Sequence, residues 1–155
     1  MNPFECPSCG KQIPRFPFPL LTVDGLITDE QGRVLLVERR FPPPGWALPG
    51  GFVEEDEDLE PAARRELLEE TGVDLVGPLT QLGAFGAPGR DPRGRTVSVV
   101  HWTRLEALPP LRPGDDAAHA ELVPIAAIER GEVRLAFDHR EILDRALEAA
   151  RAAAP

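Results

Sequence analysis

Glutamates at helical spacing in the middle of the chain could together bind a divalent cation. Glu66, Glu69 and Glu70 occupy positions i, i+3 and i+4, so on a helix their side chains share one face within about 6 Å. Clustered carboxylates raise one another's pKa unless a positive charge lies among them. Sets of carboxylate oxygens suit hard cations such as Mg²⁺ or Mn²⁺. The spacing therefore predicts a helix-borne metal site that serves a phosphate-containing substrate.

The residues around these glutamates resemble a known motif, the Nudix box. Its pattern is Gly-x5-Glu-x7-Arg-Glu-U-x-Glu-Glu-x-Gly-U, where U is aliphatic. A solvated acidic face on a surface helix would explain the glutamates, but not Gly51, Arg65 and Gly72 at their spacings. The chain is therefore similar to Nudix hydrolases, which cleave nucleoside diphosphates linked to another moiety. The matching positions are Gly51, Glu57, Arg65, Glu66, Leu67, Glu69, Glu70, Gly72 and Val73.

The resemblance implies a role for each polar position of the box. The clustered glutamates would ligate Mg²⁺ or Mn²⁺, which activates a water and neutralises charge on the phosphoryl oxygens. The carbonyl of Gly51 would be a further ligand, because glycine lets the backbone approach closely. Arg65 and Glu57 would hold the carboxylates in place, or would form a purely structural ion pair. The predicted metal ligands are Gly51, Glu66, Glu69 and Glu70, and the predicted catalytic residues are Glu57, Arg65, Glu66 and Glu69.

The general base has two alternative sources. Members of the resembled family use either a glutamate of the box or a carboxylate from a later loop. Asp115, Asp116 and Glu121 are the acidic residues in the region where that loop is expected. Each of them is a candidate base, and each is equally compatible with an ordinary solvated acid.

A basic segment after the box is the predicted substrate-binding loop. Pro88 follows the box and precedes Arg90, Arg93 and Arg95, which resembles the ADP-ribose pyrophosphatase branch of the family. Arginines bind phosphate through forked hydrogen bonds. The alternative is a solvated hairpin turn, for which Gly, Pro and Asp are well suited.

The resemblance implies hydrolysis of ADP-ribose to AMP and ribose 5-phosphate. Alternative substrates are (d)NTPs, NADH and dinucleoside polyphosphates. A different class of function is a sensor that binds ADP-ribose without cleaving it. A degraded box would favour such a sensor, whereas this box is complete, so the sequence favours an enzyme.

A cysteine pair near the N-terminus forms half of a zinc-ribbon motif. Cys6 and Cys9 have the Cys-x-x-Cys spacing, but a structural zinc site needs four ligands and the chain has two cysteines. Two subunits could share one zinc, or a histidine could help to complete the site. The sequence favours the remaining alternative, a knuckle without metal.

Composition sets limits on location and partners. The chain has 155 residues and a formal net charge of −9, which suits one soluble domain. The negative charge argues against a nucleic-acid polymer as partner, since such binding needs basic patches. It does not exclude a small nucleotide, because bound metal ions would supply positive charge. No apolar run of about 18 residues and no secretory signal is visible. We therefore expect a cytoplasmic protein without a membrane partner; a homodimer is an open alternative, because similar enzymes are often homodimers.

Local patterns predict the elements that position these residues. Strands interleaved with helices indicate an α/β fold, and the resemblance implies an α/β/α sandwich with a mixed sheet. Residues 1–19 are predicted to form an N-terminal arm and residues 20–155 the Nudix domain. Strands are predicted at 20–28, 33–38, 75–85 and 96–105, a short extended segment at 46–53, helices at 58–71 and 138–153, and loops at 41–45 and 107–120.

The helix of the box carries both of its end signals in the sequence. Asp58 is the predicted N-cap and Gly72 the predicted left-handed residue after the last turn. The apolar face that packs on the core is predicted to consist of Leu59, Ala63, Leu67 and Leu68.

Overall fold

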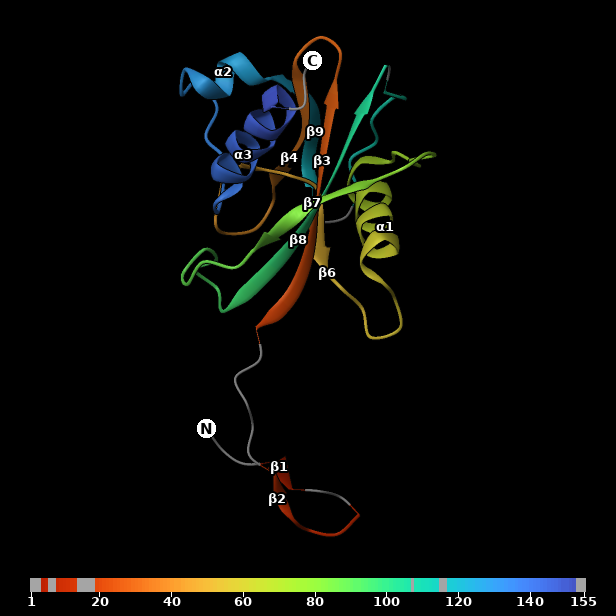
Figure 1. The fold of residues 1–155 in the computed structure, drawn as a ribbon, viewed down its shortest axis with the longest axis vertical. Helices are drawn as coiled ribbons and strands as arrows, with labels where there is room; N and C mark the ends of the chain where they lie inside the picture. Colours follow the sequence, from red (N-terminus) through yellow and green to blue (C-terminus); the bar gives the residue numbers. More distant parts are fainter. Residues whose placement is uncertain (1–3, 6–7, 14–18, 107, 115–116, 153–155) are drawn as a thin grey trace.

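The computed structural model describes residues 4–5, 8–13, 19–106, 108–114 and 117–152, and a mixed β-sheet forms its centre (Figure 1). The sheet contains β3 (Leu20–Asp29), β4 (Arg33–Arg39), β5 (Trp46–Ala47), β6 (Gly50–Phe52), β7 (Thr80–Phe85), β8 (Thr96–Leu105) and β9 (Ala117–Pro124). The helices are α1 (Leu59–Thr71), α2 (Ile125–Glu129) and α3 (His139–Ala152).

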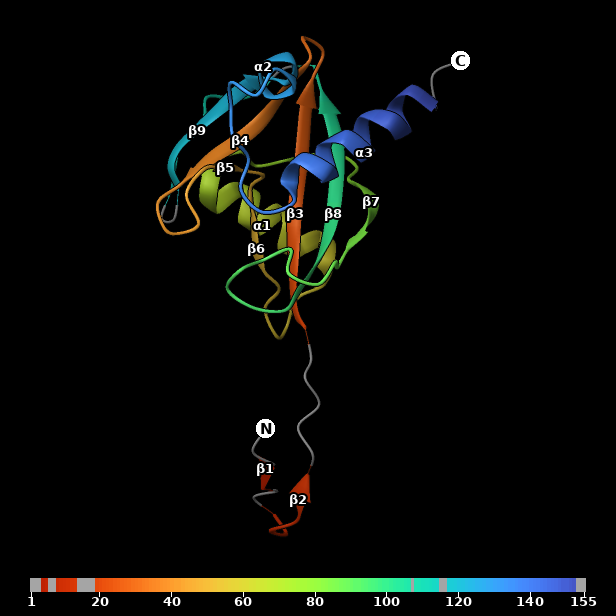
Figure 2. The same cartoon turned by 90° about the vertical axis from the view of Figure 1, so that its left-hand side faces the viewer.

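Strand β3 lies at the centre of this sheet and decides its topology. It pairs in parallel with β8 over its whole length and antiparallel with β6 at Thr22 to Asp24. Its antiparallel pairing with β4 joins Thr28 to Val34, and β4 then pairs with β9 from Arg33 to Arg39. Figure 2 shows β4 and β9 diverging from β3 and β8. Residues of β3, β4 and β6 line one cavity between these diverging strands.

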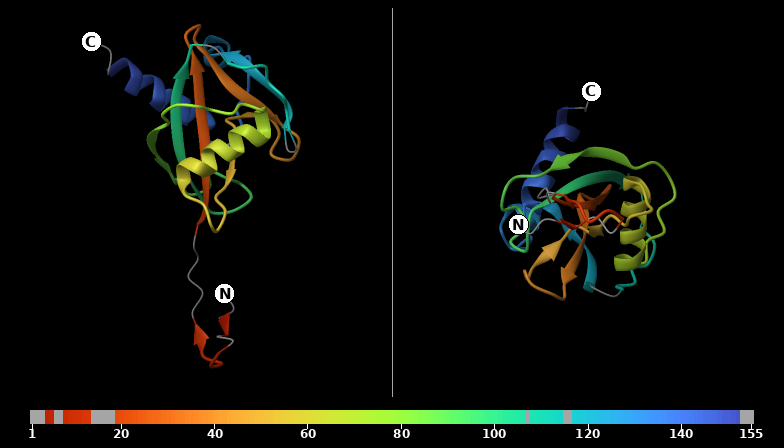
Figure 3. Two further views of the ribbon diagram at one scale, coloured as in Figure 1. Left: turned by 90° about the vertical axis from the view of Figure 1, so that its right-hand side faces the viewer. Right: turned by 90° about the horizontal axis from the view of Figure 1, so that it is seen from below.

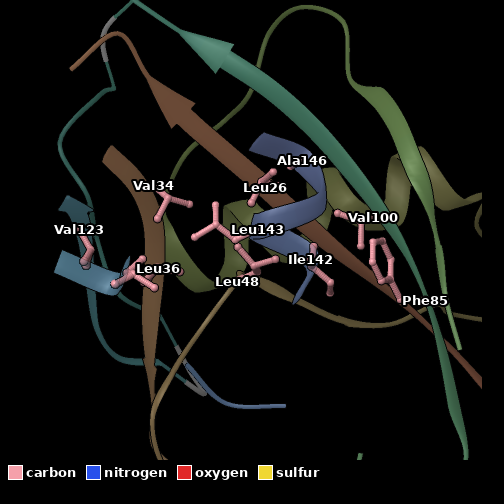
Figure 4. Close-up of a cluster of buried hydrophobic side chains, with 11 residues drawn as sticks. Leu26, Val34, Leu36, Leu48, Phe85, Val100, Val123, Ile142, Leu143 and Ala146 are labelled. Atoms are coloured by element: carbon pink, nitrogen blue, oxygen red, sulfur yellow. The ribbon is translucent and has the colours of Figure 1, made fainter. Parts of the chain in front are cut away.

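Helices cover both faces of the sheet. Leu26 of β3 packs in one cluster with Ile142 and Leu143 of α3 (Figure 4), whereas the next residue, Ile27, packs with Leu67 of α1. Successive strand residues point to opposite faces, so α1 and α3 lie on opposite sides, as Figure 3 shows. The predicted α/β/α sandwich with a mixed sheet is confirmed.

Helix α1 begins and ends where its sequence signals predicted. Asp58 accepts a hydrogen bond from the N–H of Leu59, and Gly72 has a φ of 73° and donates its N–H to the carbonyl of Leu68. The predicted apolar face needs one correction. Leu68 is 46% exposed, and Ala62 is buried in its place.

Two predicted segments differ from the structure. The strand predicted at 75–85 begins only at Thr80, because Gly77 has a φ of 122° and Pro78 cannot donate to a ladder. The loop predicted at 107–120 is wrong in its last part, because β9 begins at Ala117 and was not expected. Ala117, Ala120 and Val123 are buried along β9, since this strand pairs with β4.

Upstream of β3, the strands β1 (Phe4–Glu5) and β2 (Gln12–Ile13) form a separate two-stranded antiparallel sheet. Within the described residues, none of the helices has the length and apolar character that crossing a lipid bilayer requires.

Candidate active site

A cavity of about 350 Å³ opens where β4 diverges from β3. One wall comes from β6 and α1, the opposite wall from the end of β4 and the segment before α3, and Thr22 and Asp24 of β3 lie between them. The first wall includes Gly50, Gly51, Arg65, Glu66 and Glu70, and the second wall includes Arg39, Arg40, Arg90, Arg93, Phe137 and His139.

Glu66 lies directly against the backbone of Gly51. A Cβ atom built on Gly51 would stand 2.3 Å from Oε1 of Glu66, so a larger residue at this position would displace the carboxylate. The Glu66 side chain is 14% exposed. Burial raises the pKa of Glu66, and the nearby charges of Glu69 and Glu57 act in the same direction while Arg65 opposes them. A cation bound nearby would therefore stabilise the ionised form of Glu66.

Arg65 connects the acidic residues of this wall. Its guanidinium donates to Glu57 through Nε at 3.0 Å and Nη2 at 2.5 Å, to Glu66 through Nη1 at 2.8 Å, and to the carbonyl of Phe52 at 3.0 Å. The hydrogen bond from Arg65, followed by one from the N–H of Glu54, lowers the pKa of Glu57. Arg65 thus fixes the loop before α1 and the Glu66 carboxylate at once, which suits both roles that the sequence left open.

The other two box glutamates differ in their surroundings. Glu69 is 56% exposed and lies 3.2 Å from Nη1 of Arg65. Glu70 lines the cavity and accepts the N–H of Gly50 at Oε2, at 2.9 Å. Among the described residues, no three acidic, histidine or cysteine side chains stand together as ligands of a metal ion would. The set of oxygen donors nevertheless suits a hard divalent cation, and the Glu66 carboxylate lies against the backbone of Gly51.

The basic segment after β7 only partly faces the cavity. Arg90 has a side chain that is 5% exposed and donates a forked pair of hydrogen bonds to Asp138, at 2.8 and 2.7 Å. Arg93 lines the cavity and pairs with Asp91 at 2.8 Å. Arg95 donates to the carbonyl of Thr96, and neither it nor the exposed Pro88 is among the described residues that line the cavity.

Phe137 lies on the second wall in an unusual backbone conformation. Among the described residues it is the one non-glycine with a positive φ, 55°, which is rare for a bulky side chain. The guanidinium groups of Arg39 and Arg93 lie 4.7 and 5.1 Å from the centre of its ring. Strained backbone is often found at ligand sites, and here it turns an aromatic ring and two cations to the same cavity.

A backbone seam ties the two segments of the second wall together. The N–H of Trp46 donates to the carbonyl of Arg134 at 3.1 Å, and the N–H of Ala136 donates to the carbonyl of Trp46 at 2.7 Å. Trp46 follows the turn after β4, and Ala136 precedes Phe137. The position of Phe137 is therefore coupled to that of β4.

Asp24 and His139 face the cavity together and were not predicted as site residues. The His139 side chain is 4% exposed and that of Asp24 is 9% exposed, and Nε2 of His139 lies 3.7 Å from Oδ1 of Asp24. The N–H of Leu48 donates to Nδ1 of His139 at 2.9 Å. Burial lowers the pKa of His139, which favours the neutral imidazole. The partners of His139 are distant in the chain, so no local sequence pattern indicates that it belongs to the site.

The remaining candidate residues lie away from the cavity or outside the residues that the structure describes. Glu121 is on β9, with a side chain that is 55% exposed and 3.6 Å from Nε2 of His119, and it does not line the cavity. Asp115 and Asp116 lie outside the described residues, as does Cys6. Cys9 is exposed, with a free thiol.

Known proteins match the chain in both sequence and fold. Residues 19–146 match the family model described as the NUDIX domain. ADP-ribose pyrophosphatase of Methanocaldococcus jannaschii is 39% identical over 128 residues, which cover 81% of this chain and 71% of that protein. The ADPR responsive transcriptional repressor NtrR of Acinetobacter baylyi is 37% identical over 138 residues, which cover 84% of this chain and 54% of that protein.

A solved structure extends the likeness to three dimensions. The NUDIX domain of Shewanella oneidensis NrtR, crystallised with ADP ribose, superposes with a TM-score of 0.79 at 33% identity. The match covers 87% of this chain and 90% of that one. The similarity thus includes the arrangement of the elements around the cavity.

Proposed function

Because the chain belongs to the Nudix family and is a Nudix hydrolase, we propose that it hydrolyses ADP-ribose to AMP and ribose 5-phosphate. The observation that carries this proposal is a single cavity with acidic and basic walls. The box residues Glu66 and Glu70 line one side, and Arg39, Arg40 and Arg93 line the other. A diphosphate linked to two sugars needs cations at its phosphates and polar groups at its sugars, and this cavity offers places for both.

In the proposed reaction, the residues of the first wall bind the metal ion and position its ligands. Mg²⁺ held by Glu66, Glu69, Glu70 and the carbonyl of Gly51 would neutralise charge on the diphosphate and lower the pKa of a water. Gly51 keeps the space that Glu66 needs, and Arg65 holds Glu57 and Glu66 in fixed positions. In this proposal a carboxylate of the box accepts the proton of the attacking water, which the bound ion would make more acidic.

The second wall supports binding of the phosphates and of the organic part of the substrate. Guanidinium groups bind phosphate oxygens through paired hydrogen bonds, and the ring of Phe137 offers a flat apolar surface beside Arg39 and Arg93. Arg90 and Arg93 both line the cavity and are both paired with an aspartate, but the Arg93 side chain is 47% exposed and that of Arg90 is 5% exposed. In this proposal Arg93 therefore contacts the ligand and Arg90 supports the wall.

Product analysis tests the proposal. The purified protein is incubated with Mg²⁺ and, separately, ADP-ribose, NADH, a dNTP and diadenosine tetraphosphate, and the products are separated by chromatography. We expect ADP-ribose to give AMP and ribose 5-phosphate with the highest kcat/KM. A strong preference for the dNTP would contradict the substrate but leave the hydrolase class intact.

A second candidate is an ADP-ribose-binding regulator. The match to a protein named as an ADPR-responsive repressor, and to a NUDIX domain crystallised with ADP ribose, favours it. The two candidates differ in one measurement. A regulator would bind ADP-ribose in calorimetry and release no AMP when Mg²⁺ or Mn²⁺ is added, whereas the hydrolase releases AMP only with the ion.

A further inference from the structure

We propose that Asp24 and His139 together bind one ribose hydroxyl of the substrate, beside its diphosphate. This inference rests on the proposed function, because it concerns the same cavity and a ribose-containing diphosphate. It adds a determinant of specificity that lies outside the Nudix box. Asp24 and His139 would then select a sugar that carries this hydroxyl over one that lacks it.

The hydrogen bond from Leu48 decides which nitrogen of His139 carries the proton. Nδ1 accepts the N–H of Leu48 at 2.9 Å, so it has no proton of its own. The neutral ring must therefore carry its proton on Nε2. Nε2 is the atom that lies 3.7 Å from Asp24, and the His139 side chain lines the cavity. His139 thus presents a hydrogen-bond donor of fixed position.

Asp24 presents an acceptor beside that donor. The hydroxyl of Ser98 donates to Oδ2 of Asp24, and Nη2 of Arg90 lies 3.9 Å from the same oxygen. These contacts fix the carboxylate from behind. In the part of the chain that the structure describes, Oδ1 accepts no hydrogen bond, and the distance of 3.7 Å to Nε2 of His139 is too long for one. Asp24 therefore keeps a lone pair available to a ligand.

A hydroxyl group fits this pair of atoms. It both donates and accepts, and an oxygen at about 2.8 Å from each partner satisfies normal hydrogen-bond geometry. An oxygen at those two distances spans the separation of 3.7 Å without moving either side chain. A buried donor and acceptor left without a partner cost free energy, so a ligand that lacks the hydroxyl should bind more weakly.

The position of Asp24 relative to the box favours a sugar over a base. A Cβ built on Gly50 would stand 2.7 Å from Oδ1 of Asp24, and the N–H of the same Gly50 donates to Glu70 at 2.9 Å. One residue therefore separates Asp24 from a box carboxylate. In a nucleoside diphosphate sugar, the ribose is the group joined directly to the phosphates, whereas the base lies one ring further away.

Substrate analogues test the proposal with the unmodified protein. The four probes are ADP-ribose lacking the 2′- or 3′-hydroxyl of the adenosine ribose, and ADP-ribose lacking the 2″- or 3″-hydroxyl of the terminal ribose. We expect one analogue to lose about 10- to 100-fold in kcat/KM, as for a hydrogen bond to a charged group. The analogue that loses it identifies which ribose and which hydroxyl are bound. Equal kcat/KM for all four analogues and ADP-ribose would overturn the inference.

Variants then connect the loss to the two side chains. In Asp24→Asn and His139→Gln, the discrimination against that analogue should shrink, because ADP-ribose loses the contact while the analogue never had it. His101→Gln is the matched control, since His101 is also a buried histidine but does not line the cavity. It should keep the discrimination of the unmodified protein. Full discrimination in both Asp24→Asn and His139→Gln would overturn the assignment of these residues.

A binding measurement separates this inference from the proposed function. Calorimetry with ADP-ribose and the four analogues, in EDTA, reports the hydroxyl contact without any turnover. Absence of AMP release together with weaker binding of one analogue would contradict the proposed hydrolysis and support the contact. Hydrolysis of ADP-ribose with equal binding of all four analogues would support the proposed hydrolysis and contradict the hydroxyl contact. If Asp24→Asn does not fold, the discrimination measured in His139→Gln decides the assignment, and full discrimination in that variant would overturn it.

Discussion

The carboxylate of Glu66 fills the space that a side chain at position 51 would need, with Oε1 only 2.3 Å from where the Cβ atom would stand. The position of a charged group in the site is thus set by the absence of an atom in a neighbouring strand. This contact joins β6, which carries the first residue of the box, to α1, which carries its glutamates.

Gly51→Ala should therefore reduce activity sharply. The added methyl group displaces the Glu66 carboxylate, and a misplacement of about 1 Å at a reacting site can cost ~100-fold. The measurement is kcat/KM on ADP-ribose. Gly25→Ala is the control, since its Cβ would meet Pro49 at an ordinary 3.7 Å. Similar activity in the two variants would contradict the role of this contact.

Glu69→Gln and Glu70→Gln should each lower kcat by more than the ~10–100-fold that loss of a residue behind a metal ligand costs. A neutral amide replaces an anionic oxygen ligand poorly, while its shape is almost unchanged. Steady-state kinetics with Mg²⁺ and circular dichroism give the two readouts. Glu60→Gln, on the same helix but paired with Arg64 at 2.7 Å, should keep normal kcat. Near-normal activity in both test variants would remove the metal-site proposal.

Glu57 and Glu66 should respond oppositely to neutralisation in protein stripped of divalent ions. The pKa of Glu57 lies below its usual 4.5, so its stabilising contribution is present above that pH and is lost as the pH falls through the folded-state value. The pKa of Glu66 is raised, so its ionised form costs stability once the pH exceeds 4.5.

At neutral pH, Glu57→Gln should therefore lower Tm and Glu66→Gln should raise it. Thermal melts in EDTA at a series of pH values check both signs, and both differences should shrink in acid. A fall in Tm for Glu66→Gln that matches that of Glu57→Gln would show that burial does not dominate at Glu66.

The buried histidines should make the protein less stable in mild acid. Burial lowers the pKa values of His101 and His139 below the usual 6.5. Their contribution to stability is therefore complete above pH 6.5 and declines as the pH falls below it, because the unfolded chain binds protons first. His101→Gln and His139→Gln should each flatten the fall of Tm between neutral pH and about pH 5. A pH profile of Tm that neither variant changes would contradict this.

The ion pair between Arg90 and Asp138 should be important for stability. Its side chains are 5% and 13% exposed, and removing one partner of a buried pair costs about 3–5 kcal/mol. Asp138→Asn and Arg90→Leu should both lower the free energy of unfolding in urea. The exposed pair of Arg130 and Glu132 is the control, and Glu132→Gln should change the stability little. Equal effects at the two pairs would contradict a structural role for Arg90.

The sequence allowed accurate prediction where the signals are local. The N-cap at Asp58 and the left-handed Gly72 are decided by residues within one turn of the helix ends, and both predictions are confirmed. Strand β9 was missed because its burial depends on pairing with β4, which no local pattern reveals. The strand predicted at 75–85 was too long at its start for a different reason, because Gly77 and Pro78 interrupt the extended segment before Thr80.

The candidate site divides in the same way. The box wall could be predicted because its residues lie within one short segment with a known spacing. Most of the second wall could not, although the basic segment that contains Arg93 was predicted, because it depends on contacts such as that of Leu48 with His139, which are 91 residues apart. Arg90 shows the limit of reading charge alone, since its guanidinium is paired with Asp138 in the fold.

The backbone seam between Trp46 and residues 134 and 136 has a consequence for how the cavity can change its width. Arg39 lies at the end of β4, and Phe137 directly follows Ala136. The two hydrogen bonds of Trp46, at 3.1 and 2.7 Å, therefore couple the segment that follows β4 to the segment that contains Phe137. Any motion that widens the cavity on this side must either break both bonds or carry the two segments together. We therefore expect Arg39 and Phe137 to move together, toward a bound ligand or away from it.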